Sequence, residues 1–206
     1  EGTMSLLEKL QTSMLTADGA MGTLLYSYGI DYCNEELNIQ KPEIIEKIHQ
    51  DYIAAGADII QTNTYGANAI KLARYGLENQ VKEINEAAIQ IAKRAAASGN
   101  QFVLGTIGGI RGIRKSDATL QEIIHSLDQQ AIQLLAGDPD GLLLETYYDF
   151  EELKTTVTYL RTLTDIPIIA QVSMHDPGIL QNGLPLNDAL HELETIGANI
   201  VGVNCR

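Results

Sequence analysis

The chain has 206 residues, of which 45% are hydrophobic and 20% charged, and its formal net charge at pH 7 is -13. A chain of this length can bury one substantial core, so we expect a single domain. The acidic balance argues against a nucleic-acid surface, where Lys and Arg would have to neutralise phosphates. No apolar run approaches the roughly 18–20 residues that cross a bilayer, and the two cysteines form no close-spaced framework. We therefore expect a cytoplasmic protein that binds neither nucleic acid nor membrane.

Short apolar runs alternate along the chain with segments of helical periodicity. Residues 1–3 are interpreted as a cloning remnant, which leaves 4–206 as the domain. The expected strands are 14–17, 58–61, 102–104, 141–144, 167–172 and 199–203. The expected helices between them are 42–56, 79–98, 120–135, 150–163 and 186–196. The strands are apolar without clear alternation, which is typical of parallel strands buried on both faces and joined by helical crossovers.

Two folds fit this alternation. A doubly wound open sheet could be complete with six strands, whereas a closed (β/α)₈ barrel needs eight strands and typically about 250 residues. Polar or glycine-containing segments follow the carboxyl end of every expected strand, whereas an open sheet would concentrate its site at one switch point. We therefore expect an α/β fold of the (β/α)₈ TIM-barrel type, truncated after about the sixth strand.

The ends of three expected strands carry the main candidate residues. Asp18-Gly19 fits an ordinary turn and equally a ligand site, in which Asp18 meets an ammonium and backbone N–H groups meet a carboxylate. Glu145 follows four apolar strand residues, where an unpaired carboxylate is costly, so we interpret it as a substrate contact and Asp149 as a helix N-cap. Cys205 is a candidate thiolate ligand or nucleophile, but one Cys cannot form a metal site alone.

Three further features carry weaker signals. The glycine-rich segment 105–112 lacks the P-loop and Rossmann patterns, so we expect a flexible loop at the top of the barrel. His175 has no second His or Cys spaced to bind a metal with it, and we expect a polar or substrate-facing loop residue. Cys33 lies away from the strand ends, and we expect a free thiol.

Several motifs, taken in chain order, carry a family resemblance. They are Asp18-Gly19-Ala20-Met21-Gly22-Thr23, Leu37-Asn38, Lys41-Pro42-Glu43, Gly56-Ala57-Asp58-Ile59-Ile60, Thr62-Asn63-Thr64-Tyr65, Glu145-Thr146 and Gly202-Val203-Asn204-Cys205. With these motifs the sequence resembles the homocysteine S-methyltransferase family over essentially its whole length. It looks closest to the N-terminal module of bacterial bifunctional homocysteine S-methyltransferase/5,10-methylenetetrahydrofolate reductases, and the homocysteine domain of cobalamin-dependent methionine synthase is similar too.

The resemblance implies zinc-dependent transfer of a methyl group to the thiolate of homocysteine, which forms methionine in one-carbon metabolism. By resemblance, Cys205 is one of three zinc thiolates, and the other two come from a Gly-Gly-Cys-Cys segment that this sequence does not contain. Asp18, Gly19 and Glu145 would hold the amino acid end of homocysteine. Asn63 and Asn204 would be orienting polar groups.

The resemblance also implies partners. The methyl donor would be methyltetrahydrofolate, with S-methylmethionine as the alternative, and the parent protein would carry a C-terminal reductase domain. Without the two further cysteines and the last two strands, we expect the 206-residue chain to be inactive, to bind no stoichiometric zinc and to self-associate through open sheet edges. The alternative function is an aldolase- or isomerase-like barrel for a phosphorylated substrate, which would need a catalytic Lys at a strand end, and no expected strand ends in one.

Overall fold

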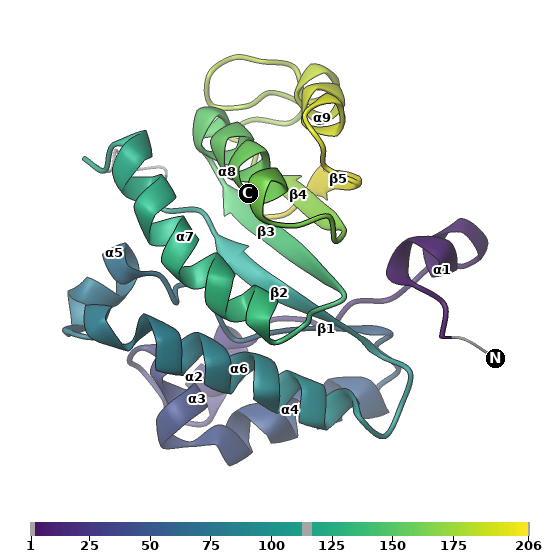
Figure 1. Cartoon of the computed structure of the whole chain (residues 1–206), viewed down its shortest axis with the longest axis vertical. Helices are drawn as coiled ribbons and strands as arrows, with labels where there is room; N and C mark the ends of the chain where they lie inside the picture. Colours follow the sequence, from purple (N-terminus) through teal and green to yellow (C-terminus); the bar gives the residue numbers. More distant parts are fainter. Residues whose placement is uncertain (1–2, 113–116, 206) are drawn as a thin grey trace.

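The computed structural model describes residues 3–112 and 117–205. Five parallel strands form one sheet in the order in which they occur along the chain (Figure 1). They are β1 (Ile59–Gln61), β2 (Phe102–Gly108), β3 (Gly141–Tyr147), β4 (Ile168–Val172) and β5 (Ile200–Val203). A doubly wound sheet would reverse its strand order at a switch point, whereas consecutive parallel strands are the arrangement of a (β/α)₈ barrel. The barrel-type fold is confirmed, as an arc of five strands.

The long helices lie where the periodicity predicts them. They are α4 (Pro42–Ala54), α6 (Val81–Ala96), α7 (Leu120–Ala136), α8 (Phe150–Leu163) and α9 (Leu186–Thr195). Local signals fix their starts, because Thr119 and Glu122 form a capping box at α7 and the Asp149 carboxylate accepts a hydrogen bond from the Glu152 N–H at α8. The role of Asp149 as an N-cap is therefore confirmed.

Shorter helical segments were not expected from the sequence. They are α1 (Leu6–Thr12), α2 (Gly22–Ser27), α3 (Leu37–Gln40), α5 (Ala69–Leu72) and the 3₁₀ turns η1 (Asn34–Glu36), η2 (Ala73–Tyr75) and η3 (Glu78–Gln80). All of them belong to the segments that precede β1 or that link β1 to α6. Among the described residues, no helix combines the length and apolarity needed to span a membrane.

The expected first strand, 14–17, is wrong. Only Ala17 pairs with the sheet, in a single parallel bridge to Ile59, and the Asp58 carboxylate accepts a hydrogen bond from the Thr16 N–H at 2.8 Å. Met14 is 96% exposed, so this apolar run lacks the burial that would stabilise a full strand. The bridge nevertheless delivers the chain that follows it to the carboxyl end of β1.

The core has two layers on opposite faces of the sheet. On the outer face, β1 and β2 pack against α6, and β3 and β4 pack against α7, α8 and α9. On the inner face, Leu6 of α1 packs against apolar residues at the start of the strands. Figure 1 shows α1 on the side of the sheet opposite to α6, α7 and α8.

The inner face changes from apolar to polar along the strands. Its apolar positions are Ile59, Leu104, Leu143 and Ile169. Two residues further along each strand, on the same face, stand Gln61, Thr106, Glu145 and Gln171. The side chains along each strand alternate between the two faces of the sheet, although the apolar runs do not make this visible in the sequence. This alternation places polar side chains at the carboxyl edge of the inner face.

Candidate functional site

A cavity of about 240 Å³ lies at the carboxyl ends of β1, β2 and β3. The residues singled out in the sequence that line it are Asp18, Gly19, Asn63 and Glu145. They come from the segment after the Ala17 bridge, the end of β1 and the inner face of β3. Residues that are distant in the sequence therefore face one space.

Two carboxylates in this cavity form no ion pair with a described Lys or Arg. Asp18 accepts a hydrogen bond from the Gln61 N–H at 3.0 Å, but its Oδ1 is buried without a partner in the described part of the chain. Burial, together with the nearby charge of Glu145, raises the pKa of Asp18 to about 7. Burial also raises the pKa of Glu145, and no described residue donates a hydrogen bond to its carboxylate. No Lys or Arg is among the described lining residues, so the cavity is short of positive charge.

Free backbone donors lie beside Asp18. The N–H groups of Gly19 and Ala20 donate to no other group in the described part of the chain. The Tyr52 hydroxyl donates to the Ala20 carbonyl at 2.8 Å, and a Cβ at Gly19 would lie 2.8 Å from that hydroxyl. A side chain at position 19 would displace the Tyr52 hydroxyl, so glycine permits the close approach of Tyr52, which holds the segment in place. The arrangement leaves two N–H groups able to bind an anion.

Asn63 has its amide engaged within the protein. Its Nδ2 donates to the Asn34 carbonyl at 2.8 Å and to Asn38 Oδ1 at 3.1 Å, and Asn38 donates back to the Asn63 carbonyl at 2.8 Å. The side chain is 7% exposed. Its nitrogen thus fixes the segment around α3 against the end of β1.

Asn204 forms hydrogen bonds across the sheet with Thr146, the residue that follows Glu145. Its Oδ1 accepts from the Thr146 N–H at 2.8 Å and its Nδ2 donates to Thr146 Oγ1 at 2.9 Å. Thr146 has a φ of 60° and Cys205 a φ of 55°, a region that costs a non-glycine residue about 1–3 kcal/mol and is concentrated at functional sites. Here the strain accompanies a register shift between Leu144 and Tyr147. Asn204 therefore stabilises the irregular end of β3 that carries Glu145.

Cys205 is exposed at the same rim. Its Sγ lies 3.7 Å from Thr146 Oγ1. The described residues contain no cluster of three or more His, Cys, Asp or Glu side chains that could hold a metal ion, and zinc sites take three or four protein ligands. The described residues therefore do not by themselves fit zinc, although Cys205 offers one thiol.

The two other candidate ligands lie elsewhere. Cys33 is a free thiol, as expected, and burial raises its pKa to about 11, which keeps it protonated at neutral pH. His175 is exposed in the segment after β4. Neither forms a metal-binding cluster with other described residues.

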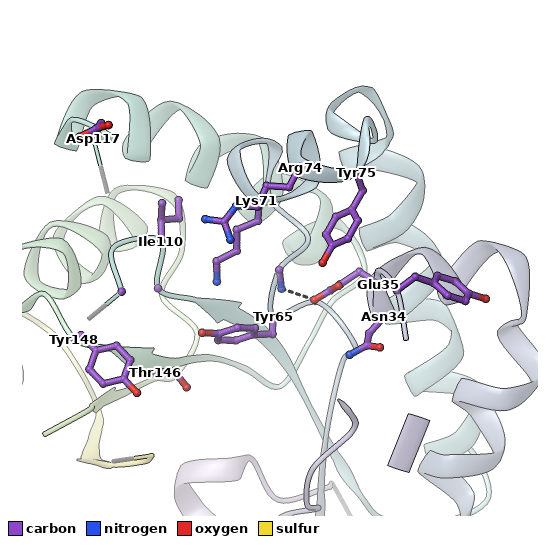
Figure 2. A pocket seen from close by; sticks show the side chains of 14 residues that line it. Asn34, Glu35, Tyr65, Lys71, Arg74, Tyr75, Ile110, Asp117, Thr146 and Tyr148 are labelled. Atoms are coloured by element: carbon purple, nitrogen blue, oxygen red, sulfur yellow. Dashed lines mark hydrogen bonds between the residues drawn. The ribbon is translucent and has the colours of Figure 1, made fainter. Parts of the chain in front are cut away.

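A second, larger cavity of about 730 Å³ adjoins the first, and Tyr65 lines both. Sequence reasoning missed its basic residues, Lys71 of α5 and Arg74 of η2, because neither stands at a strand end. Lys71 Nζ lies 3.9 Å from the centre of the Tyr65 ring, and Figure 2 shows the lysine reaching toward that ring. Gly108 makes room for Tyr65, since a Cβ there would collide with the tyrosine.

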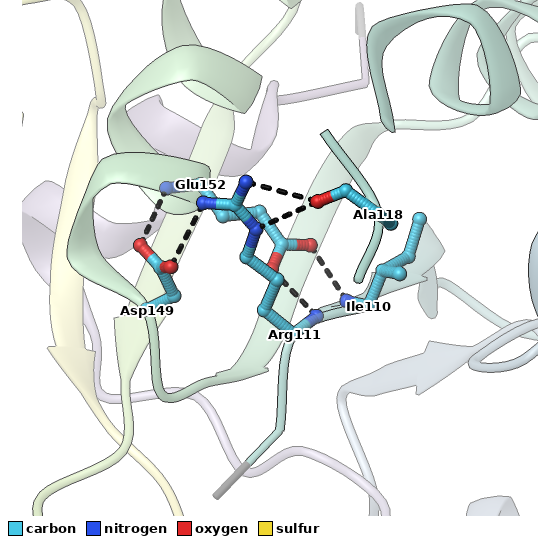
Figure 3. Close-up of polar contacts among 5 residues, drawn as sticks. All are labelled: Ile110, Arg111, Ala118, Asp149 and Glu152. Atoms are coloured by element: carbon cyan, nitrogen blue, oxygen red, sulfur yellow. Dashed lines mark hydrogen bonds and ion pairs between the residues drawn. The ribbon is translucent and has the colours of Figure 1, made fainter. Parts of the chain in front are cut away.

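The expected loop at 105–112 is wrong for 105–108 and is confirmed for 109–112, which form no helix or strand. Residues up to Gly108 belong to β2, and the next part is held by a buried carboxylate. Glu152, 1% exposed, accepts hydrogen bonds from the Ile110 N–H at 2.6 Å and the Arg111 N–H at 2.8 Å. The Arg111 guanidinium pairs with Asp149 at 3.0 Å and donates to the Ala118 carbonyl (Figure 3). This wall of the larger cavity is therefore anchored to the start of α8.

Comparison with known proteins assigns the family. A family model described as homocysteine S-methyltransferase matches residues 15–206. The methionine synthases of Mycobacterium tuberculosis and Mycobacterium leprae are each 31% identical to the chain over 219 aligned positions. Those alignments cover 97% of this chain, which spans 18% of the length of either relative.

Solved structures agree on the fold. The metallated form of the homocysteine methyltransferase MmuM from Escherichia coli superimposes with a TM-score of 0.84 at 24% identity, covering 95% of this chain and 76% of that one. The family match includes the segments that build both cavities. The chain therefore belongs to the homocysteine S-methyltransferase family.

Proposed function

We propose that this chain binds homocysteine in the 240 Å³ cavity and is the acceptor part of an enzyme that makes methionine. The observation that carries the proposal is the pair of carboxylates, Asp18 and Glu145, which share the cavity without a cation. The amino acid end of homocysteine is a zwitterion. Its ammonium offsets the two carboxylates, and its carboxylate accepts from the free N–H groups of Gly19 and Ala20.

Asn204 and Asn63 have positioning roles in this proposal. Asn204 holds Thr146 and thereby the end of β3 from which Glu145 points into the cavity. Asn63 fixes the neighbouring wall through Asn34 and Asn38. Neither amide nitrogen needs to touch the substrate for these roles.

The transfer itself is a displacement at a methyl carbon. A bond forms between the homocysteine sulfur and the methyl carbon, the bond from that carbon to the donor breaks with its electron pair leaving on the donor, and the thiol proton goes to water. A free thiol with a pKa near 8.5 is only a few per cent ionised at neutral pH, so the thiol needs activation. In the proposal Cys205 is one thiolate ligand of a zinc ion, but we assign no step to the metal because the described residues supply a single ligand.

The donor and the larger assembly are part of the same proposal. The proposed donor is methyltetrahydrofolate, with S-methylmethionine as the alternative, and the proposed partner is a reductase domain in the parent protein.

The alternative function, an aldolase or isomerase acting on a phosphorylated substrate, is disfavoured by the charge of the small cavity. Two carboxylates in a cavity whose described lining contains no Lys or Arg would repel a phosphate.

Replacing Glu145 by Gln tests the proposal, because the change keeps the shape and removes the charge. Losing one charge-assisted contact costs about 1.5–3 kcal/mol, so homocysteine should bind roughly 10- to 100-fold more weakly in calorimetric titration. Glu83→Gln, on the exposed side of α6, is the matched control and should bind as the unaltered chain does. Equal affinities for Glu145→Gln and the control would refute the assignment.

A further inference from the structure

The larger cavity is not used by homocysteine in the proposal above. Its volume of about 730 Å³ is within the range of about 300–1,000 Å³ that is usual for small-molecule sites. Tyr65 lines both this cavity and the 240 Å³ cavity. A ligand in the larger cavity would therefore be a direct neighbour of the homocysteine.

Lys71 gives this cavity a positive charge that forms no ion pair with a described carboxylate. The side chain is half-buried, and no carboxylate among the described residues lies within ion-pair distance of its Nζ. Burial lowers its pKa to about 8, although Glu35, Glu152 and Glu145 act in the opposite direction through space. A partly desolvated ammonium is costly unless it is paired.

Two of the acidic residues that act on Lys71, Glu35 and Glu152, accept hydrogen bonds from backbone N–H groups, and the third, Glu145, faces the 240 Å³ cavity without an ion pair to Lys71. Glu35 accepts a hydrogen bond from the Gly66 N–H at 2.6 Å, drawn as a dashed line in Figure 2, and Glu152 accepts from two backbone N–H groups. Asp117 lies at the far edge of the cavity from Tyr65 in Figure 2. The lining adds a second cation, Arg74, which is exposed and forms no ion pair with described residues.

The remaining walls suit an organic ligand. Tyrosine rings line the cavity from several segments, namely Tyr32, Tyr65, Tyr75 and Tyr148. The opposite wall at Ile110 is held by Glu152 and by the Arg111–Asp149 pair (Figure 3). A fixed wall lowers the ordering cost of binding.

We propose that the larger cavity binds the methyl donor through a carboxylate group of that donor, which pairs with Lys71 beside the Tyr65 ring. The role of the ligand as donor rests on the proposed function, whereas the binding of a carboxylate at Lys71 does not. Methyltetrahydrofolate carries carboxylates on its glutamate, and S-methylmethionine carries one on its amino acid end. Either would supply the counter-charge that Lys71 lacks.

The test is calorimetric titration of the chain with methyltetrahydrofolate and, separately, with S-methylmethionine. Lys71→Met keeps the length of the side chain and removes its charge, and it should weaken the binding of at least one donor roughly 10- to 100-fold. Lys71→Arg keeps the charge and should recover most of that affinity. Lys82→Met, at an exposed site on α6, is the matched control and should bind both donors as the unaltered chain does.

Homocysteine titrations and thermal melts of the same variants separate the outcomes. Lys71→Met should melt within a few degrees of the control and keep the homocysteine affinity of the unaltered chain within about threefold, because the ammonium contacts are in the other cavity. A loss for one donor alone identifies that donor as the ligand. Unchanged affinity for both donors in Lys71→Met, or a chain that binds homocysteine and neither donor, would overturn the inference. Failure to bind homocysteine would instead count against the proposed function.

Discussion

Replacing Asp18 by Asn should make the free chain more stable and, at the same time, weaken its affinity for homocysteine. Burial holds the pKa of this carboxyl at about 7, against an ordinary value of 3.8. The unfolded chain therefore releases the proton near pH 4, whereas the folded chain retains it until about pH 7. Stability falls as the pH rises through this window and stays lower above it, because the folded state then carries a poorly solvated charge.

The size of the effect follows from the difference in pKa. About three units at 1.36 kcal/mol each give about 4 kcal/mol as an upper limit. Asp18 is only partly buried, so solvent screening reduces the expected gain for Asp18→Asn to about 1–2 kcal/mol at pH 8. For a chain of this size that corresponds to an increase in Tm of roughly 2–8 °C. The Asn oxygen can still accept the hydrogen bond from the Gln61 N–H.

Thermal melts at pH 8 and pH 5 measure this effect. The gain should be clear at pH 8 and smaller at pH 5, where Asp18 is protonated in the folded chain. Asp31→Asn, at an exposed position, is the control and should melt as the unaltered chain does at both pH values. An unchanged or lower Tm for Asp18→Asn at pH 8 would show that the carboxyl is not strained in the free protein.

Two further predictions concern acid stability and zinc. His49 is fully buried, and burial lowers its pKa to about 4; stability should therefore fall by up to about 3 kcal/mol as the pH drops from 6.5 toward 4. His49→Leu should reduce this acid sensitivity in urea titrations, and a pH dependence equal to that of the exposed control His191→Gln would contradict the argument. The chelator-washed 206-residue chain should hold less than one zinc per chain, because Cys205 is a single ligand. One tightly retained zinc in metal analysis would show that other groups complete the site.

Long periodic segments made most of the fold predictable. The helices α4, α7 and α8 begin at signals visible in the sequence, at Pro42, Thr119 and Asp149. The run 14–17 is apolar as well, but it forms one bridge because its burial depends on neighbours far along the chain. The sequence pattern shows which residues are apolar, but it does not show which of them pack against other residues in the fold.

The candidate site was predictable only where residues follow strands. Asp18 follows the Ala17 bridge and Glu145 lies near the carboxyl end of β3, and the parallel order of the strands brings them to the same edge. Lys71 reaches the rim through a four-residue helix, and no pattern in the sequence marks it. Glu152 resembles any polar residue in the first turn of a helix, and only the fold shows that it holds the Ile110–Arg111 segment.

In the proposed function, Asp18 and Glu145 hold the ammonium of homocysteine. Calorimetric titration with homocysteine and with 4-mercaptobutanoate, which has the same thiol and carboxylate but no ammonium, tests it most directly. We expect the chain to bind homocysteine at one site and to bind the analogue at least about 100-fold more weakly, since the analogue leaves both carboxylates unpaired. Equal affinity for the two ligands, or tighter binding of 4-mercaptobutanoate, would contradict it.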